Sequence, residues 1–175
     1  DEQGLYSVIS EKIAEVQAEH IEGNHVIDGF TGIGGSAIAF ARSGKRVTTI
    51  DTNKKRLEMA KHNAAVYVVG DKINFIRGDF FDVASKIKAD TIYLDPPWGG
   101  PSYKEHGVFR LGNFSPDGDK LLSFSLERVS EVILRVPTIF DTDEIMRHSD
   151  NFEILDDLSN GTVVSQTIII KRKTE

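Results

Sequence analysis

Short β-branched runs alternate with helical segments from residue 25 to about residue 136, and few folds accommodate this order of elements. Four of the runs end at an aspartate: 25–28 at Asp28, 46–50 at Asp51, 73–76 at Asp79 and 90–94 at Asp95. Strands separated by helices pair in parallel through right-handed crossovers. The pattern therefore predicts an α/β domain with a mainly parallel sheet. Since ligands of such sheets bind beyond the carboxyl ends of the strands, we expect the four aspartates at one rim.

The remaining segments complete this outline. Apolar spacing predicts helices over 7–22, 36–43, 54–66, 82–88, 121–129 and 142–148. Residues 99–118 read as a loop rich in glycine and aromatic side chains. A strand at 131–136 is followed by strands at 152–158 and 163–171, and Asn160-Gly161 between the last two is a strong hairpin signal. The sheet is therefore expected to end in an antiparallel hairpin.

Composition narrows the class of protein. We interpret the 175 residues as a single domain over 1–175, with 1–22 as a leading helical segment. The chain begins at Asp1 without methionine, so we expect a fragment that lacks further N-terminal residues. It has no cysteine, hence no disulfide or thiolate metal site, and no apolar run approaches the roughly 18 residues that span a bilayer. The net charge of −6 disfavours non-specific binding to nucleic acid. We expect an intracellular, soluble protein and a monomer.

The loop from Asp28 to Gly35 joins the first predicted strand to the next helix. Glycine at positions 32 and 34 lets the backbone approach a ligand closely. In dinucleotide-binding folds such a loop holds a pyrophosphate, but Asp28 would repel a phosphate and suits a cationic ligand. S-adenosylmethionine (SAM) carries an ammonium and a sulfonium group and no phosphate. Asp51 at the next strand end is placed to accept hydrogen bonds from ribose hydroxyls.

Asp79 and Phe80 follow the third strand, where a carboxylate can accept the adenine amino group and a ring can pack on adenine. Each feature also has an ordinary interpretation, because an aspartate at a strand end is often a helix N-cap. Their recurrence after three successive strands predicts a SAM cleft in a Rossmann-like class I SAM-methyltransferase fold. The predicted cofactor-binding residues are Asp28, Thr31, Gly32, Gly34, Asp51, Asp79, Phe80 and Asp95.

The stretch Asp95-Pro96-Pro97-Trp98 follows the fourth strand and fits methyl transfer to an exocyclic amine. Such an amine is conjugated and a poor nucleophile. The carboxylate of Asp95 and the carbonyl of Pro96 can accept its two N–H bonds, which favours a more tetrahedral nitrogen. Two prolines fix the backbone, and the indole can stack on a base. The alternative is a proline-stiffened strand exit with a core tryptophan, but Gly99-Gly100 favours an exposed, tightly turned loop.

The longer stretch from Asp95 to Tyr103 resembles the trimethylguanosine synthase family of RNA cap guanosine-N2 methyltransferases, whose motif is S/D-P-P-W-G-G-P-x-Y. The resemblance extends through most of the chain. It includes the opening E-Q-G-L-Y-S-V with E-K-I-A, N-A-A-V-Y at 63–67 and S-P-D-G at 115–118.

The resemblance implies methyl transfer from SAM to N2 of a guanine already methylated at N7. It implies that Asp95 and Pro96 receive the amine, that Trp98 stacks on the cationic guanine, and that Ser7 helps to hold SAM. It places Asn63 on the base edge, with Pro101 and Tyr103 also in the substrate site and Tyr103 toward the cap phosphates. It further implies 7-methylguanosine-capped small RNAs of the nuclear or nucleolar type as partners, and a nuclear or nucleolar location with the cytoplasm as an alternative.

The chain departs from the family pattern at three points. The family's W-F and T-P near the start are replaced by Leu5-Tyr6 and Ile9-Ser10. The family's arginine after the proline of the late strand is Thr138 here, so a basic phosphate clamp is not evident. The family also has an additional N-terminal helical segment.

Two alternatives stay open. One is methylation of another exocyclic amine in RNA or DNA, and the other is a non-catalytic module that binds SAM or cap. The histidines show no metal-ligand spacing, so we expect no metal site.

Overall fold

A computed structural model of the chain describes residues 10–100, 103 and 107–173. The chain forms two compact units, one up to Tyr93 and one from Leu94 onward. The two units are described separately below. The interpretation of 1–175 as one domain stays a prediction.

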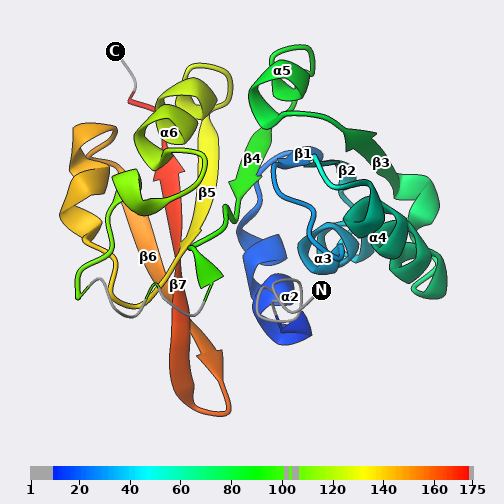
Figure 1. Ribbon diagram of the computed structural model, residues 1–175, viewed down its shortest axis with the longest axis horizontal. Coiled ribbons are helices and arrows are strands. Elements are labelled where there is room, and N and C mark those ends of the chain that lie inside the picture. Colours follow the sequence, from blue (N-terminus) through cyan, green and yellow to red (C-terminus); the bar gives the residue numbers. More distant parts are fainter. Residues whose placement is uncertain (1–9, 101–102, 104–106, 174–175) are drawn as a thin grey trace. The chain divides into compact units, whose positions relative to one another are not determined.

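The first unit contains a parallel sheet with the strand order β3-β2-β1-β4 (Figure 1). Its strands are β1 (His25–Asp28), β2 (Arg46–Asp51), β3 (Ile73–Arg77) and β4 (Thr91–Leu94). Every pairing is parallel, and Asp28 lies in register with Thr49 of β2 and Tyr93 of β4. All residues of β1 and β4 are buried, as expected for central parallel strands covered on both faces. The predicted strand positions are therefore confirmed within one residue.

The described residues of the first unit also form the helices α2 (Glu11–His20), α3 (Gly35–Arg42), α4 (Lys54–Val66) and α5 (Phe80–Ala84), with the 3₁₀ turn η1 (Gly70–Lys72). In Figure 1, α3 lies between α2 and α4. Ser10 caps α2 and Asn53 caps α4, each by accepting backbone N–H bonds. The buried positions of α2 are Ile13, Ala14, Gln17 and Ala18, and Val16 lies off this face with 42% of its surface exposed.

The second unit contains an antiparallel sheet in which β7 (Thr162–Lys171) runs between β5 (Glu131–Val136) and β6 (Phe152–Ser159) (Figure 1). The β6–β7 turn is Asn160-Gly161, with φ of +50° and +78°. Both values lie in the left-handed region that a two-residue hairpin turn requires, which confirms the predicted hairpin. The register of β6 and β7 shifts between Asp157 and Leu158, which marks a β-bulge.

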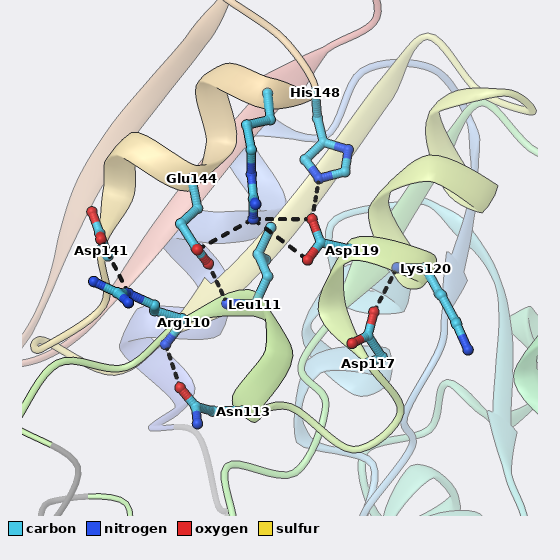
Figure 2. Close-up of polar contacts among 10 residues, drawn as sticks. Arg110, Leu111, Asn113, Asp117, Asp119, Lys120, Asp141, Glu144 and His148 are labelled. Atoms are coloured by element: carbon cyan, nitrogen blue, oxygen red, sulfur yellow. Dashed lines mark hydrogen bonds and ion pairs between the residues drawn. The ribbon is translucent and has the colours of Figure 1, made fainter.

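The described part of the second unit includes the helical elements η3 (Leu111–Asn113), α6 (Gly118–Leu126) and η4 (Thr142–Arg147). The predicted helix at 121–129 begins three residues earlier than expected because Asp117 Oδ1 accepts the N–H of Lys120 and caps it. Figure 2 shows how charged side chains join these elements. Glu144 Oε2 accepts the N–H of Leu111 at 2.6 Å, and Asp119 Oδ1 bonds His148 Nε2 at 2.9 Å.

None of the helices in the described residues is both long and apolar enough to cross a membrane.

Candidate active site

The glycine loop after β1 is fixed to two neighbouring strand ends by its backbone. Gly29 N–H donates to the Tyr93 carbonyl and Thr31 N–H donates to the Ile50 carbonyl, both at 2.9 Å. Gly34 is the N-cap residue of α3 and has φ +91°, and a Cβ there would lie 3.0 Å from the Cβ and 3.2 Å from the Cα of Ala60. Glycine is therefore required at position 34 by both its conformation and its neighbour.

Asp28 lies beneath this loop and is 1% exposed. Thr49 Oγ1 donates to its Oδ2 at 2.8 Å, and the N–H of Phe30 donates to its Oδ1 at 3.3 Å. Thr31 is also buried, and its Oγ1 bonds Thr49 Oγ1 at 2.7 Å. This chain of hydrogen bonds holds the loop to β2. A direct contact of Asp28 or Thr31 with a cofactor stays a prediction.

Asp51 is half-buried at the end of β2, with both carboxylate oxygens oriented by the backbone. The N–H of Gly32 donates to Oδ2 at 3.1 Å, and the N–H of Asn53 donates to Oδ1 at 2.8 Å. Each carboxylate oxygen can accept two hydrogen bonds, so the group keeps capacity for a pair of hydroxyls. The structure thus fixes Asp51 against Gly32, and its contact with a ribose stays a prediction.

Asp79 caps helix α5, whose first residue is Phe80. Its Oδ1 accepts the N–H groups of Phe81 at 2.9 Å and Asp82 at 3.3 Å, while its Oδ2 accepts no hydrogen bond from the described residues. The helix predicted at 82–88 therefore starts two residues earlier, because this cap ends the preceding loop. Oδ1 of Asp79 therefore serves as an ordinary N-cap, and a contact of Oδ2 with a ligand stays a prediction.

Phe80 is 3% exposed and stacks against Phe30, with ring centroids 5.8 Å apart and planes 23° apart. Phe30 is half-buried, so it presents the more accessible ring of the pair. Phe30 was not among the predicted site residues, although its place inside the glycine loop was a sufficient signal.

Asn63 lies on α4 and is half-buried. Its Nδ2 donates to the carbonyl of Ile33 at 2.9 Å, which ties α4 to the glycine loop. Its Oδ1 accepts no hydrogen bond within the described residues. The predicted contact of Asn63 with a base edge stays a prediction.

Asp95 follows β4 and belongs to the second unit, where its carboxylate is 17% exposed. Arg135 Nη1 of β5 donates to Oδ2 at 3.0 Å. Among the described residues, Oδ1 accepts no hydrogen bond. Burial raises the pKa of Asp95 above its usual range, and the guanidinium of Arg135 opposes this rise without cancelling it. A carboxylate with one oxygen held and one open can accept an N–H bond or a proton.

Trp98 is half-buried next to the same guanidinium, since Arg135 Cζ lies 5.0 Å from the indole centroid. Tyr103 meets the indole edge-on, with centroids 5.4 Å apart and planes 82° apart. The series of aromatic contacts continues from Tyr103 to Phe109 and then to Phe114. Gly99 and Gly100 have φ of +87° and +70°, which confirms the tight turn after Trp98. The predicted contact of Tyr103 with cap phosphates stays a prediction.

Sequence reasoning missed three polar residues that lie behind Asp95. Arg135 Nε donates to Ser165 Oγ at 3.1 Å, and Ser165 Oγ donates to Asp157 Oδ2 at 2.6 Å. A charged residue inside the apolar strand E-V-I-L-R-V was the available signal for Arg135. No local signal distinguishes Asp157 or Ser165 from other strand residues.

Two predicted residues, Ser7 and Pro101, lie outside the described residues, and their roles stay predictions. Within residues 10–100, 103 and 107–173, no cluster of histidine, aspartate and glutamate is arranged to hold a metal ion.

The chain is similar to known methyltransferases in sequence. A family model described as RNA cap guanine-N2 methyltransferase matches residues 23–167. The chain is 32% identical to trimethylguanosine synthase of Schizosaccharomyces pombe over 76% of this chain and 59% of that protein. It is 31% identical to trimethylguanosine synthase of Saccharomyces cerevisiae over 81% of this chain and 49% of that protein. The chain thus spans about half the length of these curated relatives.

The fold also matches solved structures. A candidate methyltransferase from Porphyromonas gingivalis aligns with 96% of this chain and 42% of its own, with a TM-score of 0.76 and 20% identity. At this level of identity the likeness concerns the fold, which is the predicted Rossmann-like fold of class I methyltransferases.

Proposed function

The chain belongs to the RNA cap guanine-N2 methyltransferase family, and from this premise we propose that it methylates N2 of a 7-methylguanosine RNA cap with SAM as methyl donor. One observation carries the proposal. Asp95, in the motif position expected to receive the amine, has Oδ2 held by Arg135 and Oδ1 open, close to the indole that Arg135 also contacts. That arrangement supplies an acceptor for an amine N–H beside a surface for stacking a base.

The residues around the glycine loop fit SAM. Asp51 has its carboxylate fixed by two backbone N–H groups and would accept the ribose hydroxyls. The open Oδ2 of Asp79 would accept the adenine amino group, and the ring pair of Phe30 and Phe80 would pack on adenine. The loop has no Cβ at Gly32 or Gly34, so its backbone can approach the ligand. When bound, SAM supplies the electrophilic methyl group.

Asp95 would act on the acceptor nitrogen. Its Oδ1 and the carbonyl of Pro96 would accept the two N–H bonds of the guanine N2 amine, which draws the nitrogen toward a tetrahedral geometry. The N2 lone pair forms the new bond to the methyl carbon as the bond from that carbon to sulfur breaks, with its electron pair remaining on sulfur. The positive charge that develops on N2 is stabilised by the adjacent carboxylate. N2 then loses one proton, and Oδ1 of Asp95 is the nearest base proposed for it.

Trp98 would hold the base. Guanine methylated at N7 is a cation, so stacking on an indole gains a cation–π contribution of about 1 kcal/mol over neutral guanine. Tyr103 meets the indole edge-on and limits the rotation of its ring. The preference for a 7-methylated acceptor would therefore depend on Trp98.

The proposed partners are capped small RNAs of the nuclear and nucleolar type, with a nuclear or nucleolar site of action. We further propose that the chain acts as a monomer. The proposals on RNA partners and location rest on the family alone, and the proposed monomer rests on the absence of an evident additional apolar surface element in the sequence.

Methyl transfer to isolated nucleotides tests the proposed function. Labelled SAM is incubated with the full-length protein and either 7-methyl-GTP or GTP, with Trp98→Ala as the control variant. We expect transfer to the 7-methylated nucleotide, little or none to GTP, and loss of transfer in the variant. Transfer to GTP and 7-methyl-GTP at equal rates would refute the requirement for N7 methylation. Binding of SAM without any transfer would favour a non-catalytic module.

A further inference from the structure

Arg135 is a buried guanidinium within strand β5, and it is 9% exposed. A lone charge is costly to bury, so such a group is retained only with charged or hydrogen-bonding partners. Among the described residues it lies beside two carboxylates and a hydroxyl. Nη1 lies 3.0 Å from Asp95 Oδ2, while Nε lies 3.1 Å from Ser165 Oγ and 3.7 Å from Asp157 Oδ2.

Asp157 is held in turn by two hydroxyls of β7. Ser165 Oγ donates to its Oδ2 at 2.6 Å and Thr167 Oγ1 donates to its Oδ1 at 2.8 Å. Asp157, Ser165 and Thr167 are all buried, although the residues around the hairpin turn are exposed. The β-bulge between Asp157 and Leu158 lies at this point of the hairpin. Bulges redirect side chains next to functional sites, and this one accompanies an inward-facing carboxylate.

We propose that Arg135 is a positioning residue for methyl transfer, which fixes Oδ2 of Asp95 so that Oδ1 faces the acceptor amine, and which is itself oriented by Asp157 and Ser165 of the β6–β7 hairpin. This inference deepens the proposed function and rests on it. We assign Arg135 a positioning role because, among the described residues, its Nη1 and Nε are directed at Asp95, Ser165 and Asp157, and because its exposure is too small for a phosphate clamp.

The charges of Arg135 and Asp157 act on Asp95, so changing either one should shift the pH dependence of activity. Within the second unit the charged groups that act on Asp95 are Arg135 of β5, which lowers its pKa, and Asp157 of β6, which raises it. Only the ionised carboxylate can take the proton that N2 loses, and it accepts an amine N–H more strongly than the protonated carboxyl does. Removing the guanidinium must therefore move the acidic limb of the activity profile to higher pH, whereas removing the Asp157 charge must move it to lower pH. A residue with a purely structural role would lower activity without shifting the limb in either direction.

The test compares Arg135→Gln, Arg135→Lys and Asp157→Asn with the wild type in the full-length protein. The exposed Arg172 provides a matched control as Arg172→Gln. Two quantities are measured: the pH profile of methyl transfer to 7-methyl-GTP, and the titration of the Asp95 carboxyl carbon by NMR without any acceptor. An adjacent arginine lowers an aspartate pKa by about 1–3 units. We therefore expect Arg135→Gln to move the acidic limb of the pH profile to higher pH by a similar amount. We expect Arg135→Lys to move the acidic limb and the Asp95 pKa upward by less, Asp157→Asn to move both downward, and Arg172→Gln to leave both unchanged.

We expect the dissociation constant of SAM to stay at the wild-type value in all four variants, and kcat rather than KM to fall in Arg135→Gln. If the limb and the NMR titration keep their wild-type positions in both Arg135→Lys and Asp157→Asn, the inference is wrong. Should Arg135→Gln fail to fold, those two variants decide the matter. Should the wild type transfer no methyl group, the proposed function fails, while the NMR titrations still establish or refute the coupling of Arg135 to Asp95.

Discussion

Two regions of the molecule contain aspartates that are held in different ways. One is the proposed cofactor region, here called the cofactor loop, which comprises the glycine loop at 29–34 with the strand ends at Asp51 and Asp79. The other is the stretch 95–98, here called the acceptor motif. At the cofactor loop, the oxygens of Asp51 and Asp79 accept backbone N–H groups from residues nearby on the loop or helix. At the acceptor motif, Asp95 is held by a guanidinium 40 residues away in sequence. The first arrangement is a property of strand ends and helix starts, and it accompanies binding. The second is a buried charge network, in which we propose that Arg135 directs the carboxylate of Asp95.

The largest effect is expected at the acceptor motif, from Asp95→Asn. The amide would turn an acceptor of amine N–H bonds into a mixed donor and acceptor, and it would remove one of the two carboxylates beside Arg135. Removal of one group that stabilises charge in a transition state costs about 10²–10³ in kcat, and we expect a loss of that size. SAM affinity, measured by calorimetry, should remain near the wild-type value. The exposed Asp150 gives the control variant Asp150→Asn, and an equal loss there would contradict the assignment.

A second effect tests whether the acceptor motif binds the base through its indole. Stacking of a base on an aromatic side chain contributes about 1–3 kcal/mol, so Trp98→Ala should raise the KM for 7-methyl-GTP by about 10- to 100-fold. Trp98→Phe should retain part of the stacking and lose part of the preference over GTP, because indole is the better cation–π partner. Steady-state kinetics with both nucleotides measures this. Unchanged discrimination in Trp98→Phe would show that another residue recognises the methylated base.

The cofactor loop is tested by two glycines with different surroundings. Gly34→Ala places a Cβ against the backbone of Ala60 at φ +91°, and we expect a loss of about 1–3 kcal/mol in the free energy of unfolding and weaker SAM binding. Gly32 has φ +52° and no atom within 4 Å of its virtual Cβ, so Gly32→Ala serves as the matched variant with a smaller loss. Chemical denaturation and calorimetry report both quantities. Equal losses in the two variants would argue against the close packing of the loop on α4.

The smallest effect concerns pH, where one carboxylate of each unit shifts in an opposite direction. Burial raises the pKa of Asp95, whereas backbone N–H bonds from His25 and Asn24 lower the pKa of Asp90. NMR should therefore place Asp95 above and Asp90 below the ordinary value of about 3.9. The contribution of Asp90 to stability is present above its ordinary pKa and is lost as pH falls through its lowered value. That of Asp95 is present below its ordinary pKa and is lost as pH rises through its raised value.

Activity should follow the ionised form of Asp95. We expect the acidic limb of methyl transfer to lie above the pKa of an ordinary aspartate, since Asp95 can take the proton from N2 only when it is deprotonated. A limb at or below the ordinary value would mean that a different group controls the reaction.

The parts of the fold that the sequence encodes locally were predicted closely. Helix α4 has the predicted bounds of 54–66, because Asn53 supplies a side-chain cap at its start. The hairpin turn at Asn160-Gly161 follows from residues that tolerate positive φ. Helices α5 and α6 begin earlier than predicted because Asp79 and Asp117 act as N-caps.

The residues of the candidate site also fall into two groups, those with a local sequence signal and those without one. Asp51 and Asp95 were predictable because each lies at a strand end beside a motif. The network of Arg135, Ser165 and Asp157 was not, because these residues lie on three strands that come together only in the folded sheet. Hydrophobic periodicity gives no signal for a buried ion pair whose partners are 40 residues apart. Tertiary pairing of β5 with β7 supplies that information.

The central claim is that the acceptor atom is the exocyclic nitrogen of a 7-methylated guanine. Its most direct test uses SAM with a ¹³C-labelled methyl group and 7-methyl-GTP containing ¹⁵N at N2, followed by NMR of the nucleotide product. We expect a coupling between the transferred methyl carbon and N2, in a product made by the wild type and reduced in Asp95→Asn. A transferred methyl group without coupling to N2 would contradict the account.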